Sequence, residues 1–234
     1  MFPTMMRRIL SHELRIPLIT LLFASFLGTA LIVVRAMLTG QGLQGFLVWN
    51  LFLAWLPLLL ALRIEASEAQ GAGRGWRFWA MIGVWLLFFP NAPYIFTDLT
   101  HLKLPIRSRW WTDLIIILLF AVQGMVLAFI SLQRMQRLLA RHRGAAAGWI
   151  FVVLVAFLSA FGVYIGRFER WNSWDVITHP ISLMTDSFTW VHWHSIRFTI
   201  LFGLFMSVVY ALLYSIMWLG RTMSSAPSVP RTGL

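Results

Sequence analysis

The chain contains no cysteine, and only 12% of its 234 residues are charged, where soluble domains carry about 25%. The absence of cysteine excludes disulfides, thiolate metal sites and cysteine nucleophiles. The shortage of charge, beside a hydrophobic fraction of 59%, excludes an ordinary soluble domain and indicates a membrane protein. The length suits one transmembrane domain, which we expect to cover residues 1–223.

Sequence motifs for nucleotide or nucleic-acid chemistry are also missing. The net charge of +11 is not concentrated in a groove-reading motif, because the basic residues lie between apolar runs. The chain has no glycine-rich phosphate loop, no nucleophile elbow and no dinucleotide fingerprint. We therefore expect membrane lipids rather than nucleic acids as partners, and the sequence indicates no oligomeric state.

Six apolar runs predict an all-α, polytopic integral membrane protein with six transmembrane helices. Most runs are near the ~20 residues that cross ~30 Å of hydrocarbon as a helix, whereas the second is short and contains Pro57. The runs cover residues 16–38, 46–62, 77–99, 112–132, 148–166 and 197–219. The first run resembles a signal peptide, but it continues well past the small residues at 28–30, so we expect an uncut helix. The Ser- and Pro-rich residues 224–234 predict a disordered cytoplasmic tail.

The distribution of Lys and Arg between the loops predicts the orientation. If the N-terminus is inside, 12 of the 19 basic residues lie on the inner side and 7 on the outer side. An excess of basic residues marks the cytoplasmic side. Both termini should therefore be cytoplasmic, and the loops after the first, third and fifth helices should face outward.

The third apolar run contains two prolines, Pro90 and Pro93, within the segment FPNAPYIFTDLTHL. Residues 77–89 alone would rise only about 20 Å, so the segment must continue past these prolines to cross the membrane. A proline inside a helix removes a backbone donor and frees a carbonyl. We therefore predict a broken third helix, supported where protein or water satisfies the freed groups.

Polar residues follow this break at helical spacing. If an α-helix resumes, Asn91, Tyr94, Asp98 and His101 share one stripe about 80° wide, with Thr97 in the same segment. Such a stripe is costly against lipid, so it should face the bundle or a wet cavity.

A second polar segment, GRFERWNSWD, follows the fifth run on the same predicted side. Its candidate residues are two cations, Arg167 and Arg170, and three further side chains, Asn172, Trp174 and Asp175. Asn172, Asp175 and His179 have the spacing of one helical face. A glycine pair, Gly162 and Gly166, comes just before it and allows close helix contact. We expect this segment and the residues after the break to meet in one outward-facing pocket, together with Asp113 at the start of the fourth helix.

The segments NAPYIFTDLTHL and GRFERWNSWD resemble the hallmark motifs of a bacterial membrane family known as domain of unknown function 1361. The similarity extends from the second helix to the sixth. It implies a multi-pass protein of the bacterial plasma membrane, and it implies no particular activity.

A metal site is the sharpest interpretation of the acids and histidines. Asp98 with His101, and Asp175 with His179, each place a carboxylate and an imidazole within reach on a helix, as a zinc-like divalent ion requires. The alternative is that the acids pair with arginines of the outer loops and stabilise the fold. The same residues Asp98, His101 and Asp175 are the candidate catalytic groups if a reaction takes place.

An anion site is the third interpretation, because Arg167 and Arg170 offer planar forks that suit phosphate or carboxylate. We expect the pocket to bind a polar or anionic ligand, such as a lipid head group or an envelope precursor. The candidate ligand-binding residues are Asn91, Tyr94, Thr97, Asp98, His101, Asp113, Arg167, Arg170, Asn172, Trp174 and Asp175. A small transporter, a structural or accessory subunit, and a metal-dependent membrane hydrolase are the alternatives. The apolar stripe within residues 180–195 predicts an interfacial helix before the sixth span.

Overall fold

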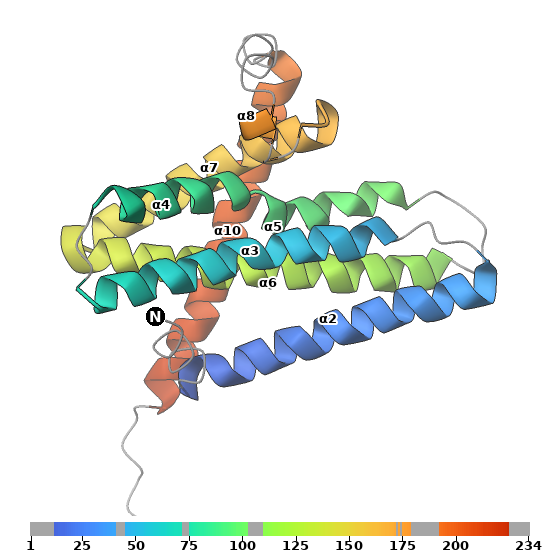
Figure 1. Cartoon of the computed structure of the whole chain (residues 1–234), viewed down its shortest axis with the longest axis horizontal. Coiled ribbons are helices and arrows are strands. Elements are labelled where there is room, and N and C mark those ends of the chain that lie inside the picture. The colour runs from blue at the N-terminus through green and yellow to red at the C-terminus, as the bar shows by residue number, and fades with distance from the viewer. Residues whose placement is uncertain are drawn as a thin grey trace, which may run out of the picture.

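The computed structural model describes residues 12–40, 45–71, 75–102, 110–171, 173, 175–178 and 192–224. These residues form helices and short connections, and no strand occurs among them. The helices, coloured along the chain in Figure 1, are α2 (His12–Thr39), α3 (Gly45–Ala69), α4 (Trp76–Phe88), α5 (Asn91–Tyr94), the 3₁₀ helix η1 (Ile95–His101), α6 (Trp110–Arg143), α7 (Ala145–Phe168), α8 (Asp175–Thr178) and α10 (Trp193–Ser224).

Six helical segments in the described part of the chain are long and apolar enough to cross a membrane, which confirms the predicted fold class. They are Leu14–Thr39, Gly45–Ala69, Trp76–Thr100, Trp110–Arg143, Ala145–Phe168 and Trp193–Gly220. The third consists of α4, α5 and η1, interrupted at Pro90 as predicted. The predicted interfacial helix and the predicted disordered tail fall largely outside the described residues.

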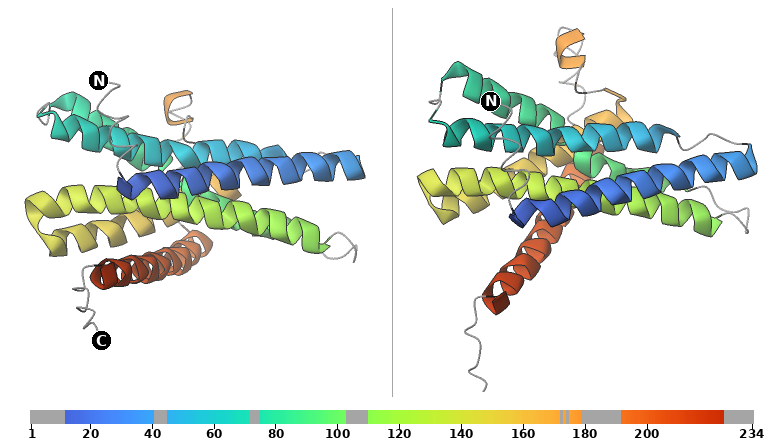
Figure 2. Two further views of the ribbon diagram at one scale, coloured as in Figure 1. Left: turned by 90° about the horizontal axis from the view of Figure 1, so that it is seen from below. Right: turned by 60° about the horizontal axis from the view of Figure 1, so that its bottom comes forward.

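Helix α6 lies at the centre of the bundle and packs against α2, α3, α5, η1 and α7. Helices α2, α3, α4 and α6 run along the long axis, whereas α10 crosses at a steep angle and packs on α7 (Figures 1 and 2). The beginning of α2 and the end of α10 lie at the same end of the bundle (Figure 2). This arrangement is the one that an even number of spans requires.

Helix α6 extends well beyond the predicted boundary at residue 132, and α3 extends beyond residue 62. The extensions pair with each other: Arg134 Nη1 lies 2.9 Å from Glu65 Oε2, and His142 contacts Glu68. Hydropathy marks only the apolar part of a helix, so it does not reveal polar turns that are stabilised by a partner helix. We call the end of the bundle with η1 and the last turn of α7 the motif end. The other end, which has these two pairs, is the opposite end.

Polar side chains join the helices inside an otherwise apolar core. Trp85 Nε1 donates to Ser131 Oγ at 2.8 Å and links α4 to α6, and both residues are fully buried. Gln123 Nε2 donates to the Leu21 carbonyl at 3.0 Å and links α6 to α2. Gln123 therefore forms an interhelical hydrogen bond.

Glycines let two helices approach the broken third span. A β-carbon at Gly162 would lie 2.8 Å from Pro90 Cγ, and one at Gly166 would lie 3.4 Å from the Tyr94 ring. Only a residue without a side chain fits the first contact. The small-residue pair on α7 therefore has the role that its spacing predicts, because it seats α7 directly against the break.

Replacing Gly124 of α6 by alanine should destabilise the protein, because the new β-carbon would lie 2.5 Å from the Ala92 carbonyl oxygen. That oxygen belongs to the backbone and moves only with the whole turn, so we expect a loss of about 1–3 kcal/mol. The measurement is the thermal unfolding midpoint in detergent. The control is Gly83→Ala, which meets no atom within 4 Å and should leave the midpoint unchanged or raised. Equal midpoints for the two variants would contradict the packing described.

Candidate functional site

Two side chains satisfy the carbonyls that the break leaves behind. Ser173 Oγ donates to the Leu87 carbonyl at 3.0 Å, and Asn91 Nδ2 donates to the Phe88 carbonyl at 2.9 Å. Asn91 Nδ2 also donates to Ser173 Oγ at 3.0 Å. These bonds replace the backbone donors that an uninterrupted helix would supply around Pro90. Asn91 therefore stabilises the break itself, which limits its role as a ligand contact.

The chain after the break is one α-helical turn followed by a 3₁₀ helix, whereas the spacing of the polar stripe was derived for a continuous α-helix. A 3₁₀ helix has three residues per turn, yet Tyr94 and Asp98 still both contact Arg167. Thr97 Oγ1 donates to the Tyr94 carbonyl at 2.7 Å, and Thr100 Oγ1 donates to the Thr97 carbonyl at 2.8 Å. These local side-chain bonds accompany the tighter winding, and hydropathy does not register them.

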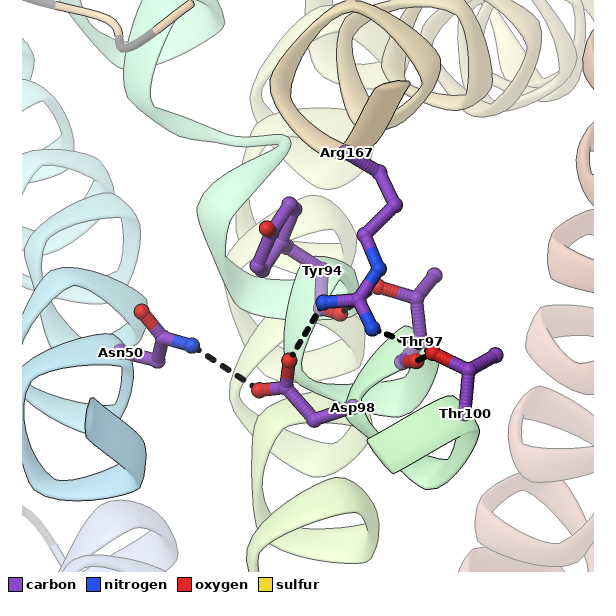
Figure 3. A network of polar contacts seen from close by, with 6 residues as sticks. All are labelled: Asn50, Tyr94, Thr97, Asp98, Thr100 and Arg167. Atoms are coloured by element: carbon purple, nitrogen blue, oxygen red, sulfur yellow. Dashed lines mark hydrogen bonds and ion pairs between the residues drawn. The ribbon is translucent and has the colours of Figure 1, made fainter. Parts of the chain in front are cut away.

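A buried ion pair joins the two motifs. Asp98 is fully buried, and its Oδ1 accepts from Arg167 Nη1 at 3.0 Å while its Oδ2 accepts from Asn50 Nδ2 at 2.9 Å (Figure 3). The expectation that the two segments meet is confirmed. For Asp98 the structure shows the acid–arginine pairing that was the alternative to a metal ligand.

Arg167 makes two more contacts with the broken span. Its guanidinium donates to Thr100 Oγ1 and lies 5.9 Å from the centroid of the Tyr94 ring (Figure 3). These contacts hold the guanidinium in one orientation, because a carboxylate, a hydroxyl and an aromatic face surround it. Asp98 therefore positions Arg167.

Two adjoining hollows lie beside this pair. The polar pocket, of about 410 Å³, is lined by Phe46, Asn50, Tyr94, Asp98, Gly166, Arg167 and Arg170. The apolar chamber, of about 460 Å³, lies between α3, α4 and α7, and apolar side chains form most of its wall. Asn50, Tyr94 and Gly166 line both hollows, so we treat them as one cleft.

Arg170 is the second cation of the polar pocket. Its side chain is exposed, and its backbone has a φ of 60°, in the left-handed region that glycine or asparagine usually occupies after a helix. Among the residues that the structure describes, none forms a hydrogen bond or an ion pair with Arg170. With one acid and two arginines in its lining, the pocket has an excess of one positive charge.

The other predicted acids lie apart from the polar pocket. Asp113 pairs with Arg35, whose Nη2 lies 2.9 Å from Asp113 Oδ2, and this pair joins α6 to α2. Asp175 Oδ1 accepts from the Thr178 hydroxyl at 3.3 Å within α8. Neither acid lines the polar pocket or the apolar chamber.

The metal hypothesis depends on residues that the structure does not describe. Asn172, Trp174 and His179 lie outside the described residues, as does the side chain of His101. Within the described ranges, no group of three or more His, Asp and Glu residues is placed to hold a metal ion. A site that includes His101 and His179 therefore stays a prediction.

Sequence reasoning missed two residues that shape the cleft. Asn50 lies in the second apolar run and binds Asp98, and Ser173 lies inside the second motif but supports the break. A signal for Asn50 was available, because it is the only strongly polar residue in the run 46–62 and such a residue needs a partner in the membrane. For Ser173 the sequence offers no comparable signal.

The chain matches the model of the family described as "Protein of unknown function (DUF1361)" over residues 49–209. This match covers more than half of the chain and includes both motifs, so the chain belongs to that family. The resemblance stated from the motifs is confirmed. No curated protein and no solved structure matches the chain.

Changing Asp98 to asparagine should destabilise the protein by about 3 kcal/mol, because it leaves the largely buried Arg167 without its counter-charge. Thermal unfolding in detergent measures the loss. The double variant Asp98→Asn with Arg167→Gln should recover much of it.

The control for this prediction is Glu169→Gln, which keeps an acceptor for the Tyr164 hydroxyl at 3.4 Å and should cost less than about 1 kcal/mol. If Asp98→Asn alone unfolds at the parent's midpoint, the pair does not stabilise the fold and the positioning role is wrong.

Proposed function

We propose that the cleft binds a ligand through an anionic group, a phosphate or a carboxylate, at the outer face of a bacterial plasma membrane. Arg170 carries this proposal, because it lies in the polar pocket with no partner among the described residues. Arginine offers a planar fork of N–H donors that matches phosphate and carboxylate.

The backbone at Arg170 supports the same role. A left-handed conformation costs a residue with a side chain roughly 1–2 kcal/mol, which glycine avoids. Arg170 has this conformation just after Glu169, the C-cap of α7, at a position that glycine usually occupies. Local strain of this kind is typical of residues whose side chain has a functional contact.

Arg167 and Asp98 have different parts in this proposal. Asp98 is buried and holds Arg167 and Asn50 in place, so it acts as a positioning residue rather than as a ligand contact. Arg167 lines the pocket in a fixed orientation. A binding group that is already ordered loses less conformational freedom on association, which strengthens binding.

The geometry favours binding over transport. A transporter needs a polar path from the cleft to the opposite end. Just before the break, the apolar side chains of Trp85 on α4 and of Phe89 after it are both fully buried, at 0% exposure. A metal-dependent hydrolase would require His101 and His179 as ligands beside an acid, and Asp98 already has two partners in Arg167 and Asn50.

The binding test compares two arginines at the motif end. Arg170→Gln should weaken the binding of phosphatidylglycerol at least tenfold, because a hydrogen bond to a charged group contributes about 1.5–3 kcal/mol. Native mass spectrometry in mixed micelles of phosphatidylglycerol and phosphatidylcholine measures the bound lipid. The matched control is Arg197→Gln, which removes an exposed cation that stacks on Trp193 outside the cleft.

The control arginine should leave lipid binding unchanged. Equal losses for the two variants would mean that the surface attracts anions without a site. The companion variant Arg170→Gly should bind as weakly as Arg170→Gln but unfold at the parent's midpoint or above it, since glycine relieves the left-handed strain.

The proposed orientation, with both termini cytoplasmic and the cleft outward, is supported by the 12 to 7 division of Lys and Arg. Since the chain has no cysteine, single cysteines report topology directly. A membrane-impermeant maleimide should label Thr178→Cys in intact cells and Arg143→Cys only after permeabilisation. The reverse pattern would invert the orientation and place the cleft on the cytoplasmic side.

A further inference from the structure

The polar pocket and the apolar chamber differ in chemistry but adjoin. The pocket has Asp98, Arg167 and Arg170 in its wall, whereas the chamber is lined largely by apolar side chains of α3, α4 and α7. Shared lining residues join them without a separating element. A small soluble anion would fill only the pocket, and a neutral hydrocarbon would fill only the chamber.

The chamber has the size and the access that a hydrocarbon chain requires. Its volume of about 460 Å³ lies within the ~300–1,000 Å³ of typical ligand sites. Two of its lining residues, Trp49 on α3 and Leu158 on α7, have 54% and 51% of their surface exposed. Because exposed apolar residues on a membrane span face lipid, the chamber is open to the bilayer between these helices.

Aromatic residues place the boundary between the two hollows at the membrane surface. Trp49 and Trp171 both line the chamber, and Trp171 directly follows Arg170. Tryptophan prefers the level of the lipid head groups. An anionic group bound at Arg170 would therefore lie at the depth where a lipid carries its own phosphate.

We propose that the ligand is an anionic lipid, bound with its phosphate in the polar pocket and one hydrocarbon chain in the apolar chamber. This inference rests on the proposed function and names its ligand class. In this inference the chamber contributes to the affinity for the lipid, whereas the proposed function requires only the anion site. The lipid enters sideways from the bilayer past Trp49 and Leu158.

Gly83 provides the test. It lines the chamber on α4, and a β-carbon there would meet no atom within 4 Å, so Gly83→Leu adds an isobutyl group to the chamber without a backbone clash. The affinity for lysophosphatidylglycerol should fall about tenfold, the loss expected when about two methylene groups are no longer buried. The matched control is Gly220→Leu, which also meets no atom within 4 Å but lies near the end of α10, away from the cleft.

The control should bind like the parent. Parent-like binding by Gly83→Leu, with binding still lost in Arg170→Gln, would overturn the chamber's role and leave the anion site standing. Parent-like binding by Arg170→Gln would instead overturn the proposed function.

A chain-length series on the parent protein needs no variant. Affinity should rise well over tenfold from glycerol 3-phosphate to lysophosphatidylglycerols of increasing chain length, and level off once the chamber is full. Inorganic phosphate should bind no better than glycerol 3-phosphate. An affinity that does not change with chain length would overturn the inference, because the phosphate would then be the whole ligand.

Discussion

The ion pair between Asp98 and Arg167 is the interaction on which the cleft depends. A carboxylate that is fully buried within a membrane span is tolerated only with a counter-charge and hydrogen bonds, and Asp98 has Arg167 on one oxygen and Asn50 on the other. The pair joins the 3₁₀ helix η1 to the last turn of α7. It thereby fixes where α7 ends, and with it where Arg170 projects into the pocket.

The break in the third span makes this pair possible. Without Pro90 the span would continue as α4, and Asp98 would have a different depth and direction. The freed carbonyls are satisfied by Asn91 and by Ser173 from the second motif, so the two motifs stabilise each other across the break. Much of the polar chemistry in these motifs therefore builds the cleft, and Arg170 together with the chamber supplies the binding surface.

Hydropathy and two prolines were sufficient to predict the six spans and the position of the break, because both depend on local chain chemistry. That the two motifs meet followed from their shared depth. The 3₁₀ winding after Tyr94 was not predictable, since the threonine hydroxyl bonds and the contact with α7 that accompany it are not registered by hydropathy. Asn50 could have been predicted to need a polar partner, but which partner it has depends on how α3 packs against η1. The apolar chamber was missed because it depends on how three helices pack, which no single segment encodes.

The most direct test of this account is an electron cryomicroscopy map of the protein in nanodiscs that contain phosphatidylglycerol and phosphatidylcholine. One elongated density should begin at the guanidinium of Arg170, pass Tyr94 and end between α3, α4 and α7. A cleft closed by side chains, or lipid density only on the outer faces of the bundle, would contradict it.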